Sequence, residues 1–149
     1  MNLYNKIKFY EKEDLDEIVS IENKSHLTPW TKKNFTDAYN AKNLFRVLKN
    51  QSNIIGYYIA LFSDEECQLL NITVRLELKK RGFGQLMIEN LFKECRKKNI
   101  HDIFLEVRAS NSSAIRLYEK KGFNEIGIRK NYYKIIDGKE DAILMGLAL

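Results

Sequence analysis

The stretch Leu69–Phe92 constrains the fold of this chain most strongly. It begins as an apolar strand, crosses a turn of three cationic residues at 79–81, and passes through Gly82 and Gly84 into a long amphipathic helix. A strand that runs through glycine into a helix start gathers unpaired backbone N–H groups and the positive end of a helix dipole at one point. Such a point binds anions. With three cationic side chains at its rim, the stretch predicts a diphosphate ligand in preference to a lone carboxylate.

Two other kinds of phosphate loop fit this stretch poorly. The dinucleotide fingerprint needs a third glycine at the position where this chain has Met87. The triphosphate loop needs four residues between its glycines, followed by Lys and Ser or Thr, and the chain has no such run. A nicotinamide, flavin or ATP-hydrolysing site is therefore not expected. From this stretch alone, a glycine-capped turn with solvated lysines stays open as the alternative.

The composition indicates a single globular domain over residues 1–149. The chain is 44% hydrophobic and 30% charged, and a chain of this length buries enough surface to fold without disulfides or metals. Its two cysteines, Cys67 and Cys95, lack the spacing of metal ligands, so no metal is expected. No apolar run approaches the length of about 18 residues that a membrane span needs, and charged residues interrupt the amino-terminal segment. We therefore expect a cytoplasmic protein without a membrane span or signal peptide.

The net charge of +5 is compatible with two kinds of anionic partner. Nucleic acid is one, because basic proteins bind its phosphates. The lysines, however, are spread along the chain among 20 acidic residues, and they form no basic stripe interleaved with aromatic residues. We therefore favour an anionic cofactor and expect no direct contact with nucleic acid.

Hydrophobic spacing divides the chain into strands and helices. Period-two patterns and turn signals predict strands at 7–9, 44–48, 54–62, 67–74, 103–107, 126–136 and 142–147. Residues with capping chemistry predict helix starts at Asp14, Thr31 and Asn111, and another helix begins at Gly82. Gly122 is expected to end the helix that follows Asn111, and Asp137-Gly138 to form the turn of a final hairpin.

These elements predict an α+β fold. The helix after Gly82 separates strand 67–74 from strand 103–107, so these two strands are expected to lie parallel in a right-handed unit. The remaining strands are predicted to be antiparallel neighbours joined by turns. We therefore predict a mixed, mostly antiparallel sheet of about seven strands, with one central parallel pair and helices on both faces.

Glu106 and Tyr118 stand out as groups that could do chemistry. Glu106 lies inside the apolar strand 103–107, where alternation places it on one face with Phe104 and Arg108. A carboxylate in such a strand costs free energy unless it is paired, solvated or used, and an ion pair with Arg108 is the structural alternative. Tyr118 follows in the next helix, and its spacing alone favours a core tyrosine.

The block from Leu105 to Phe123 resembles a known coenzyme-binding motif. It reads LEVRASN over Leu105–Asn111, and continues with Ala114-Ile115, Leu117-Tyr118-Glu119 and Gly122-Phe123. This block is similar to the second coenzyme A motif of the GCN5-related N-acetyltransferases (GNAT), and the resemblance implies the GNAT fold.

The glycine-containing turn resembles the pyrophosphate loop of the same family. The family pattern is Gln or Arg, two residues, Gly, one residue, and Gly or Ala, and Lys79, Gly82 and Gly84 stand at these positions. Lys79 departs from the pattern, because lysine faces a phosphate as a point charge and not as a planar fork.

A narrower resemblance covers nearly the full chain. Its motifs are Pro29-Trp30, Asn71-Ile72, the block 106–123, Asn131-Tyr132-Tyr133, Asp137-Gly138 and Glu140-Asp141-Ala142. Together they look like the bacterial ribosomal-protein-alanine N-acetyltransferases. The resemblance implies transfer of an acetyl group from acetyl-CoA to the amino-terminal amine, with alanine as the expected residue, of a small-subunit ribosomal protein.

The resemblance also implies roles for individual residues. Glu106 would accept a proton from the amine through water, and Tyr118 would give a proton to the departing thiolate. Trp30, Tyr132 and Tyr133 would flank the groove for the protein terminus. Acetyl-CoA would be held by Ile72, Thr73, Val74, Lys79, Lys80, Arg81, Gly82, Phe83, Gly84, Gln85 and Asn111.

Other functional interpretations stay open from the sequence. The acceptor could be a lysine side chain or a small amine, and the chain could be a non-catalytic acyl-coenzyme A-binding module. Direct transfer in a ternary complex is expected, because Cys67 is the only nearby candidate for an acylated side chain and its spacing favours a strand residue packed in the sheet. Trp30 and the two tyrosines could pack without touching substrate. His26 and His101 are interpreted as surface or loop residues.

Overall fold

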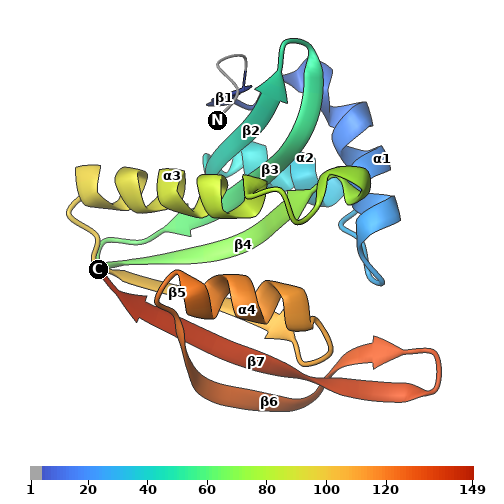
Figure 1. Cartoon of the computed structure of the whole chain (residues 1–149), viewed down its shortest axis with the longest axis vertical. Coiled ribbons are helices and arrows are strands. Elements are labelled where there is room, and N and C mark those ends of the chain that lie inside the picture. Colours follow the sequence, from blue (N-terminus) through green and yellow to red (C-terminus); the bar gives the residue numbers. More distant parts are fainter. Residues whose placement is uncertain (1–4) are drawn as a thin grey trace.

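One sheet of seven strands organises residues 5–149, the part of the chain that the computed structural model describes (Figure 1). The strands are β1 (Asn5–Phe9), β2 (Leu44–Asn50), β3 (Asn53–Phe62), β4 (Glu66–Val74), β5 (Asp102–Arg108), β6 (Asn124–Ile135) and β7 (Gly138–Ala148). They lie in the order β1-β2-β3-β4-β5-β7-β6. The predicted number of strands is therefore confirmed for the described residues.

The central pair of strands opens along its length. β4 and β5 are parallel, as predicted, and their pairing runs from Glu66 opposite Asp102 to Leu69 opposite Leu105. Beyond this point both strands continue unpaired with each other, and Figure 1 shows them diverging. All other neighbouring strands are antiparallel. The diverging ends of β4 and β5 leave a gap in the sheet that side chains and a ligand can enter.

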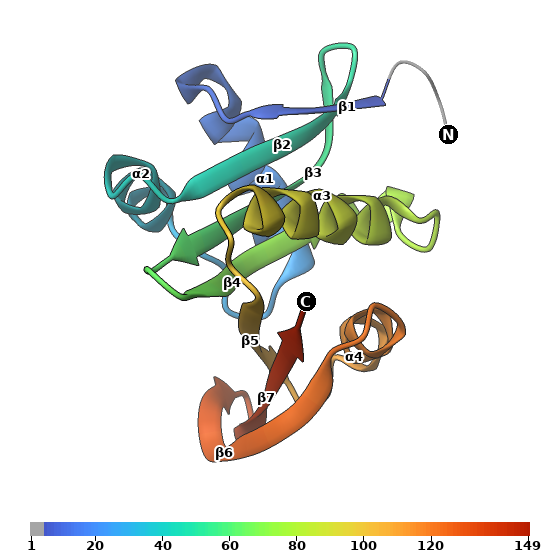
Figure 2. The same cartoon turned by 90° about the vertical axis from the view of Figure 1, so that its left-hand side faces the viewer.

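Helices cover both faces of the sheet, as predicted. They are α1 (Leu15–Ser25), α2 (Lys32–Asn40), α3 (Phe83–Lys97) and α4 (Ser112–Lys120), with 3-10 turns η1 (Lys12–Asp14) and η2 (Leu76–Leu78). In Figure 2, α3 lies in front of β2–β4 and α1 behind them. Each layer has its own core, built around Phe35 and Tyr57 on the α1 side and around Leu91 and Ile103 on the α3 side. Within residues 5–149, no helix has both the length and the apolar character to cross a membrane.

The predicted caps are partly confirmed. Thr31 caps α2 in a reciprocal capping box, in which its hydroxyl accepts from Asn34 N at 3.1 Å and Asn34 Oδ1 accepts from Thr31 N at 2.9 Å. Asp14 stands at the predicted start of α1, but its side chain does not cap the helix. Its carboxylate instead accepts from Glu11 N at 2.9 Å and pairs with Lys49 Nζ at 2.7 Å. The cation on β2 is the stronger partner for this carboxylate.

The last hairpin is longer and less regular than its sequence predicts. Gly138 forms the turn with φ +143°, and β7 begins there, four residues before the predicted 142. The pairing register shifts between Arg129 and Tyr133, where Asn131 has φ +55° and its N–H donates to Asp141 Oδ1 at 2.9 Å. A bulge of this kind redirects side chains on the bulged strand. It sets the directions of Tyr132 and Tyr133.

Candidate active site

The loop Lys79–Gln85, called here the glycine loop, ends in the exposed amino terminus of α3. Gly82 is the N-cap of α3 with φ +87°, a backbone conformation in which any side chain is strained. The first backbone hydrogen bond of the helix runs from Leu86 N to Gly82 O at 3.0 Å. The amides of residues 83–85 therefore have no helical acceptor, which is the arrangement that favours binding of an anion.

Gly84 lets the start of α3 approach α4 closely. A Cβ atom on Gly84 would lie 2.9 Å from Leu117 Cδ2 on α4. Between the loop, β4 and α4 lies a cavity of about 370 Å³, called here the glycine-loop pocket. It is lined by Ile72, Thr73, Val74, Lys79, Lys80, Gly82, Phe83, Gly84, Gln85 and Asn111. These are all of the residues predicted to hold acetyl-CoA, with the exception of Arg81.

Arg81 is not part of the lining of the glycine-loop pocket. It lines an adjoining hollow of about 830 Å³ together with Arg75 and Glu77. This hollow is larger than the glycine-loop pocket, but neither Glu106 nor Tyr118 lines it. We therefore do not assign the reaction to it. The side chain of Arg81 is therefore not brought together with Lys79 and Lys80, which both line the glycine-loop pocket.

A second cavity, of about 390 Å³, occupies the gap between β4 and β5 and is called here the Glu106 pocket. Its lining includes Trp30, Glu106, Tyr118 and Tyr133, four residues that the sequence analysis placed at the site. Trp30 packs on Phe35 with 5.2 Å between ring centroids, and it forms one wall. The structure thus joins residues from the α1–α2 loop, β5, α4 and β6 around one cavity.

Tyr132 is not part of the Glu106 pocket. Its side chain is half exposed and lines an adjoining hollow, in which Glu106, Arg129 and Tyr133 also take part. Tyr133 belongs to both cavities, and the two tyrosine rings meet edge to face with centroids 5.0 Å apart. Of the two tyrosines, Tyr133 is the one placed beside Tyr118.

The carboxylate of Glu106 is paired with a residue that the sequence analysis did not single out. Its Oε1 atom lies 3.1 Å from Nε of Arg129 on β6, and its side chain is 31% exposed. The alternative of an ion pair with Arg108 is wrong, because Arg108 pairs with Glu140 on β7 at 3.1 Å. Glu106 and Arg108 of β5 therefore do not pair with each other. Each pairs with a long side chain from another strand, Arg129 of β6 or Glu140 of β7.

Arg108 frames the Glu106 pocket and was missed as a site residue. Besides Glu140, its guanidinium donates to the Thr28 hydroxyl in the α1–α2 loop and lies 4.3 Å from the ring centroid of Tyr133. A cation over an aromatic face is an attractive contact. Arg108 therefore connects β5, β6, β7 and the α1–α2 loop at the rim of the pocket.

Tyr118 supplies a protonated phenol between the two cavities. It lies on α4, is 6% exposed and lines both the Glu106 pocket and the glycine-loop pocket. Burial, and then the neighbouring Tyr133, raise the pKa of Tyr118 well above that of a free tyrosine. The phenol therefore keeps its proton at neutral pH and can donate it.

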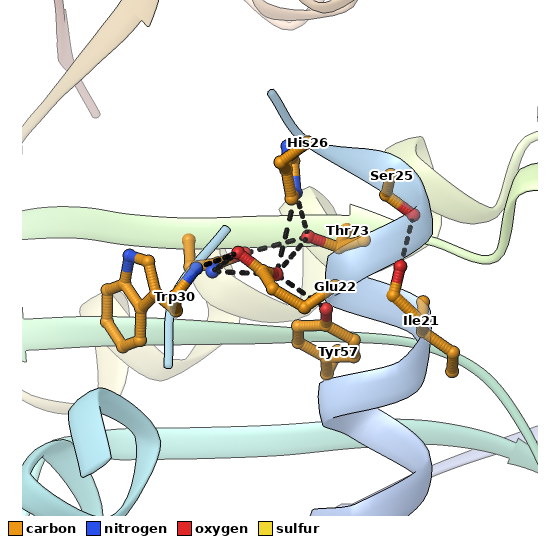
Figure 3. A network of polar contacts seen from close by, with 8 residues as sticks. Ile21, Glu22, Ser25, His26, Trp30, Tyr57 and Thr73 are labelled. Atoms are coloured by element: carbon orange, nitrogen blue, oxygen red, sulfur yellow. Dashed lines mark hydrogen bonds and ion pairs between the residues drawn. The ribbon is translucent and has the colours of Figure 1, made fainter. Parts of the chain in front are cut away.

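A buried polar network next to the Glu106 pocket was also missed (Figure 3). Glu22 of α1 is 1% exposed, and its carboxylate accepts from Trp30 N at 2.9 Å, Tyr57 O–H at 2.7 Å and Asn71 Nδ2 at 3.2 Å. The network ties α1 to β3, β4 and the loop that carries Trp30. An acidic residue within the apolar face of a predicted helix was the sequence signal for it.

His26 lies in the loop directly after α1, as predicted, and it also belongs to the same network, which the sequence analysis did not foresee. Its Nε2 atom lies 2.7 Å from Thr73 Oγ1 and 3.6 Å from Glu22 Oε1. The ring lines both the Glu106 pocket and the glycine-loop pocket. His26 is the C-cap of α1, and its N–H still donates to Glu22 O at 3.2 Å, so it stays beside Glu22 at the end of the helix.

Cys67 is placed where it cannot take an acyl group from a ligand in either cavity. Its side chain is fully buried, and it lines neither the Glu106 pocket nor the glycine-loop pocket. A hydrogen bond with the Cys95 thiol and burial raise the pKa of Cys67, which keeps it a thiol. Within residues 5–149, no group of three or more His, Cys, Asp and Glu side chains is placed to hold a metal ion.

The chain is similar to known acetyltransferases over nearly its whole length. The model of the acetyltransferase (GNAT) family matches residues 15–123. The ribosomal protein bS18-alanine N-acetyltransferase of Escherichia coli (strain K12) is 38% identical over 145 residues, which are 97% of this chain and 98% of that protein. A putative enzyme of the same name from Bacillus subtilis (strain 168) is 32% identical over 139 residues, 92% of this chain and 91% of that protein.

A solved structure agrees with this relationship. The crystal structure of the Escherichia coli ribosomal-protein-S18-alanine N-acetyltransferase superposes with a TM-score of 0.90 at 38% identity, over 97% of this chain and 93% of that chain. Its similarity extends across the sheet and both helical layers that shape the two cavities. Fold, glycine loop and family match agree, and the chain belongs to the acetyltransferase (GNAT) family.

Proposed function

We propose that this protein transfers the acetyl group of acetyl-CoA to the amino-terminal amine, alanine in the first instance, of a ribosomal protein of the bS18 type. The observation that carries the proposal is the meeting of two cavities, one at the glycine loop and one at Glu106, along the opened edges of β4 and β5. The relatives named for this activity cover nearly the full chain, which supports the choice of acceptor.

The glycine-loop pocket is the proposed site for the acetyl donor. The amides of residues 83–85 and the dipole of α3 favour its diphosphate, and Lys79 and Lys80 add positive charge at the same cavity. Residues 72–74 of β4, unpaired with β5, have a free backbone edge for the amide groups of the coenzyme arm. The donor supplies an activated thioester, so positioning provides much of the rate.

The Glu106 pocket is the proposed site for the acceptor terminus. A protein α-amino group has a pKa of about 7.7–8.0, so a base is needed to free its lone pair at neutral pH. Glu106 accepts a proton from the amine through water, and the partial exposure of its side chain leaves room for that water. Trp30 and Tyr133 form walls of the pocket that receives the chain terminus, and Tyr132 lines the adjoining hollow.

Tyr118 is the proposed donor to the coenzyme A thiolate that leaves. Its phenol is protonated at neutral pH and stands between the two cavities. The amine attacks the thioester carbon directly, so no acyl-enzyme is formed and no cysteine is required. This order of events corresponds to transfer in a ternary complex.

A peptide panel tests the proposal. Acetyl-CoA is supplied with peptides that begin with free Ala, Ser, Gly or Met, and with amino-terminally blocked peptides that carry lysine. Mass spectrometry is expected to find acetylation of the free termini, with alanine preferred. Modification of the blocked lysine peptides at an equal or higher rate would contradict the proposed acceptor.

A further inference from the structure

Five residues belong to both the Glu106 pocket and the glycine-loop pocket, and they mark where amine and thioester must meet. They are His26, Ile72, Asn111, Ala114 and Tyr118. Only His26 and Tyr118 among these five carry a group that exchanges protons near neutral pH or above. Tyr118 keeps its proton and suits a donor. His26 is therefore the one shared residue that could accept a proton.

The hydrogen bonds around Thr73 determine which nitrogen of His26 carries the proton. Asn71 donates through Nδ2 to Glu22, so the Asn71 atom at 2.8 Å from Thr73 Oγ1 is the carbonyl oxygen, which only accepts. The Thr73 hydroxyl donates its single proton to Asn71 Oδ1, which is closer than its other acceptor, Glu22 Oε1 at 3.5 Å. It can then only accept from His26, whose Nε2 carries hydrogen at 2.7 Å. Nδ1 is left with its lone pair, and within residues 5–149 no protein group donates to it.

The charges around His26 suit a base that is neutral at rest. Burial lowers the pKa of His26, and the cations Lys79 and Arg108 act in the same direction, while the Glu22 carboxylate opposes them. The imidazole is therefore neutral at pH 7. After proton uptake, the Glu22 carboxylate at 3.6 Å stabilises the imidazolium, and the exposed third of the side chain lets the proton leave to water.

We propose that Nδ1 of His26 accepts a proton from the substrate ammonium, so that His26 works as a catalytic base beside Glu106. Glu22 and Thr73 act through His26 as positioning residues, because they hold its ring and its tautomer. The inference rests on the proposed function, since it assigns the route of a proton within that reaction. It adds a second proton acceptor to the reaction. His26 lines both cavities, whereas Glu106 lines only the Glu106 pocket of the two.

Two acceptors match the number of protons that the amine nitrogen must lose. The ammonium first loses a proton to Nδ1 of His26, and the neutral amine then forms a bond to the thioester carbon. The nitrogen loses its second proton through water to Glu106 as the carbon–sulfur bond breaks. The thiolate takes one proton from Tyr118, which is restored from Glu106 by way of water, and the proton on His26 passes to solvent. The products are the acetylated terminus, coenzyme A as the thiol, and one released proton.

The tautomer is tested on the unaltered protein. The chain contains two histidines, so protein labelled with ¹⁵N-histidine has few imidazole signals, and His101→Gln identifies those of His26. We expect hydrogen on Nε2, a lone pair on Nδ1, and a midpoint of titration below the usual value of about 6.5. Hydrogen on Nδ1 in the neutral ring would overturn the proposal, because the accepting lone pair would be missing.

Substitution separates a base from a merely structural histidine. In His26→Gln, the amide NH₂ can still donate to Thr73, but the side chain has no basic nitrogen. We expect kcat to fall by roughly 10²-fold, at the low end of the range for acid–base catalysis, and the KM for acetyl-CoA, whose proposed pocket His26 also lines, to change far less than kcat. His26→Ala should be rescued by added imidazole, and the exposed His101→Gln should retain normal turnover.

The outcomes distinguish this inference from the proposed function. Wild-type transfer to free termini with normal turnover in His26→Gln would overturn the role of His26 and leave the proposed function standing. A fall in kcat without imidazole rescue in the alanine variant would reduce His26 to a positioning residue and also overturn the proposal. A wild-type protein that acetylates no free terminus would contradict the proposed function, and the role of His26 would fall with it.

Discussion

The guanidinium Nε of Arg129 lies 3.1 Å from the Glu106 carboxylate, although β7 separates their two strands in the sheet. The contact crosses the sheet just before the bulge that begins after Arg129. It holds the outermost strand β6 against the opened end of β5. The carboxylate proposed as the base and the wall formed by Tyr133 are therefore positioned by the same hairpin.

Replacing Glu106 by Gln is expected to lower kcat by roughly 10²-fold, because the amide cannot take the amine proton. The KM for acetyl-CoA should stay within twofold of the wild-type value, since Glu106 does not line the glycine-loop pocket. Steady-state kinetics with an alanine-terminated peptide measure both quantities. Glu125→Gln, at an exposed position of β6, is the matched control. Equal kcat in Glu106→Gln and the control would remove Glu106 from the chemistry.

Replacing Tyr118 by Phe is expected to lower kcat while acetyl-CoA still binds, because only the hydroxyl that protonates the thiolate is lost. The raised pKa of Tyr118 means that its acid form persists to higher pH than in a free tyrosine. Wild-type kcat should therefore show no decline from this residue up to about pH 10. A decline with a midpoint near 9 that disappears in Tyr118→Phe would contradict the assignment. Tyr39→Phe, on the exposed side of α2, is the control.

Local patterns in the sequence were sufficient to predict most of the fold. Alternation in strand 103–107 separates Glu106 from the buried Leu105, and the structure confirms this division. The cap at Thr31 and the turn at Gly138 are likewise properties of a few neighbouring residues. These features depend on spacing within one element, and spacing is what a sequence displays.

Contacts between distant segments account for what was missed. Glu22 meets Asn71 and Thr73 across 49 and 51 positions of the chain, and no local pattern couples them. Arg129 takes the place of Arg108 as the partner of Glu106 because β6 pairs with β7, from where the Arg129 side chain reaches across β7 to β5. The cofactor and acceptor residues could be named only through the resemblance of whole motifs to a family.

Truncating the buried carboxylate in Glu22→Ala is expected to destabilise the fold. Trp30 N–H, Tyr57 O–H and the Asn71 amide would lose their acceptor, and unsatisfied buried donors of this kind cost about 3 kcal/mol in total. The melting temperature should fall by roughly 6–12 °C. Calorimetry measures the fall, and the exposed Glu125→Ala should change the melting temperature little. If the melting temperature of Glu22→Ala differed from the wild-type value by less than about 2 °C, the network would contribute little to stability.

Replacing Gly82 by Ala is expected to weaken acetyl-CoA binding. A Cβ at φ +87° strains the backbone by about 1–2 kcal/mol and distorts the loop that lines the glycine-loop pocket. Gly138→Ala is a matched control, since that glycine also has positive φ and open space but lies at the hairpin tip. Titration calorimetry should show weaker coenzyme binding for the Gly82 variant alone. An equal loss in both variants would point to general destabilisation in place of a loop effect.

Transfer to ribosomal protein bS18 is the most direct test of the account. The protein is incubated with acetyl-CoA and unacetylated bS18 that begins with alanine, and tandem mass spectrometry locates the acetyl group. We predict modification of the α-amine alone, lost in Glu106→Gln and retained in Glu125→Gln. Acetylation of bS18 lysines while the α-amine stays unmodified would contradict the account. Acetylation of another amine without any transfer to bS18 would contradict it as well.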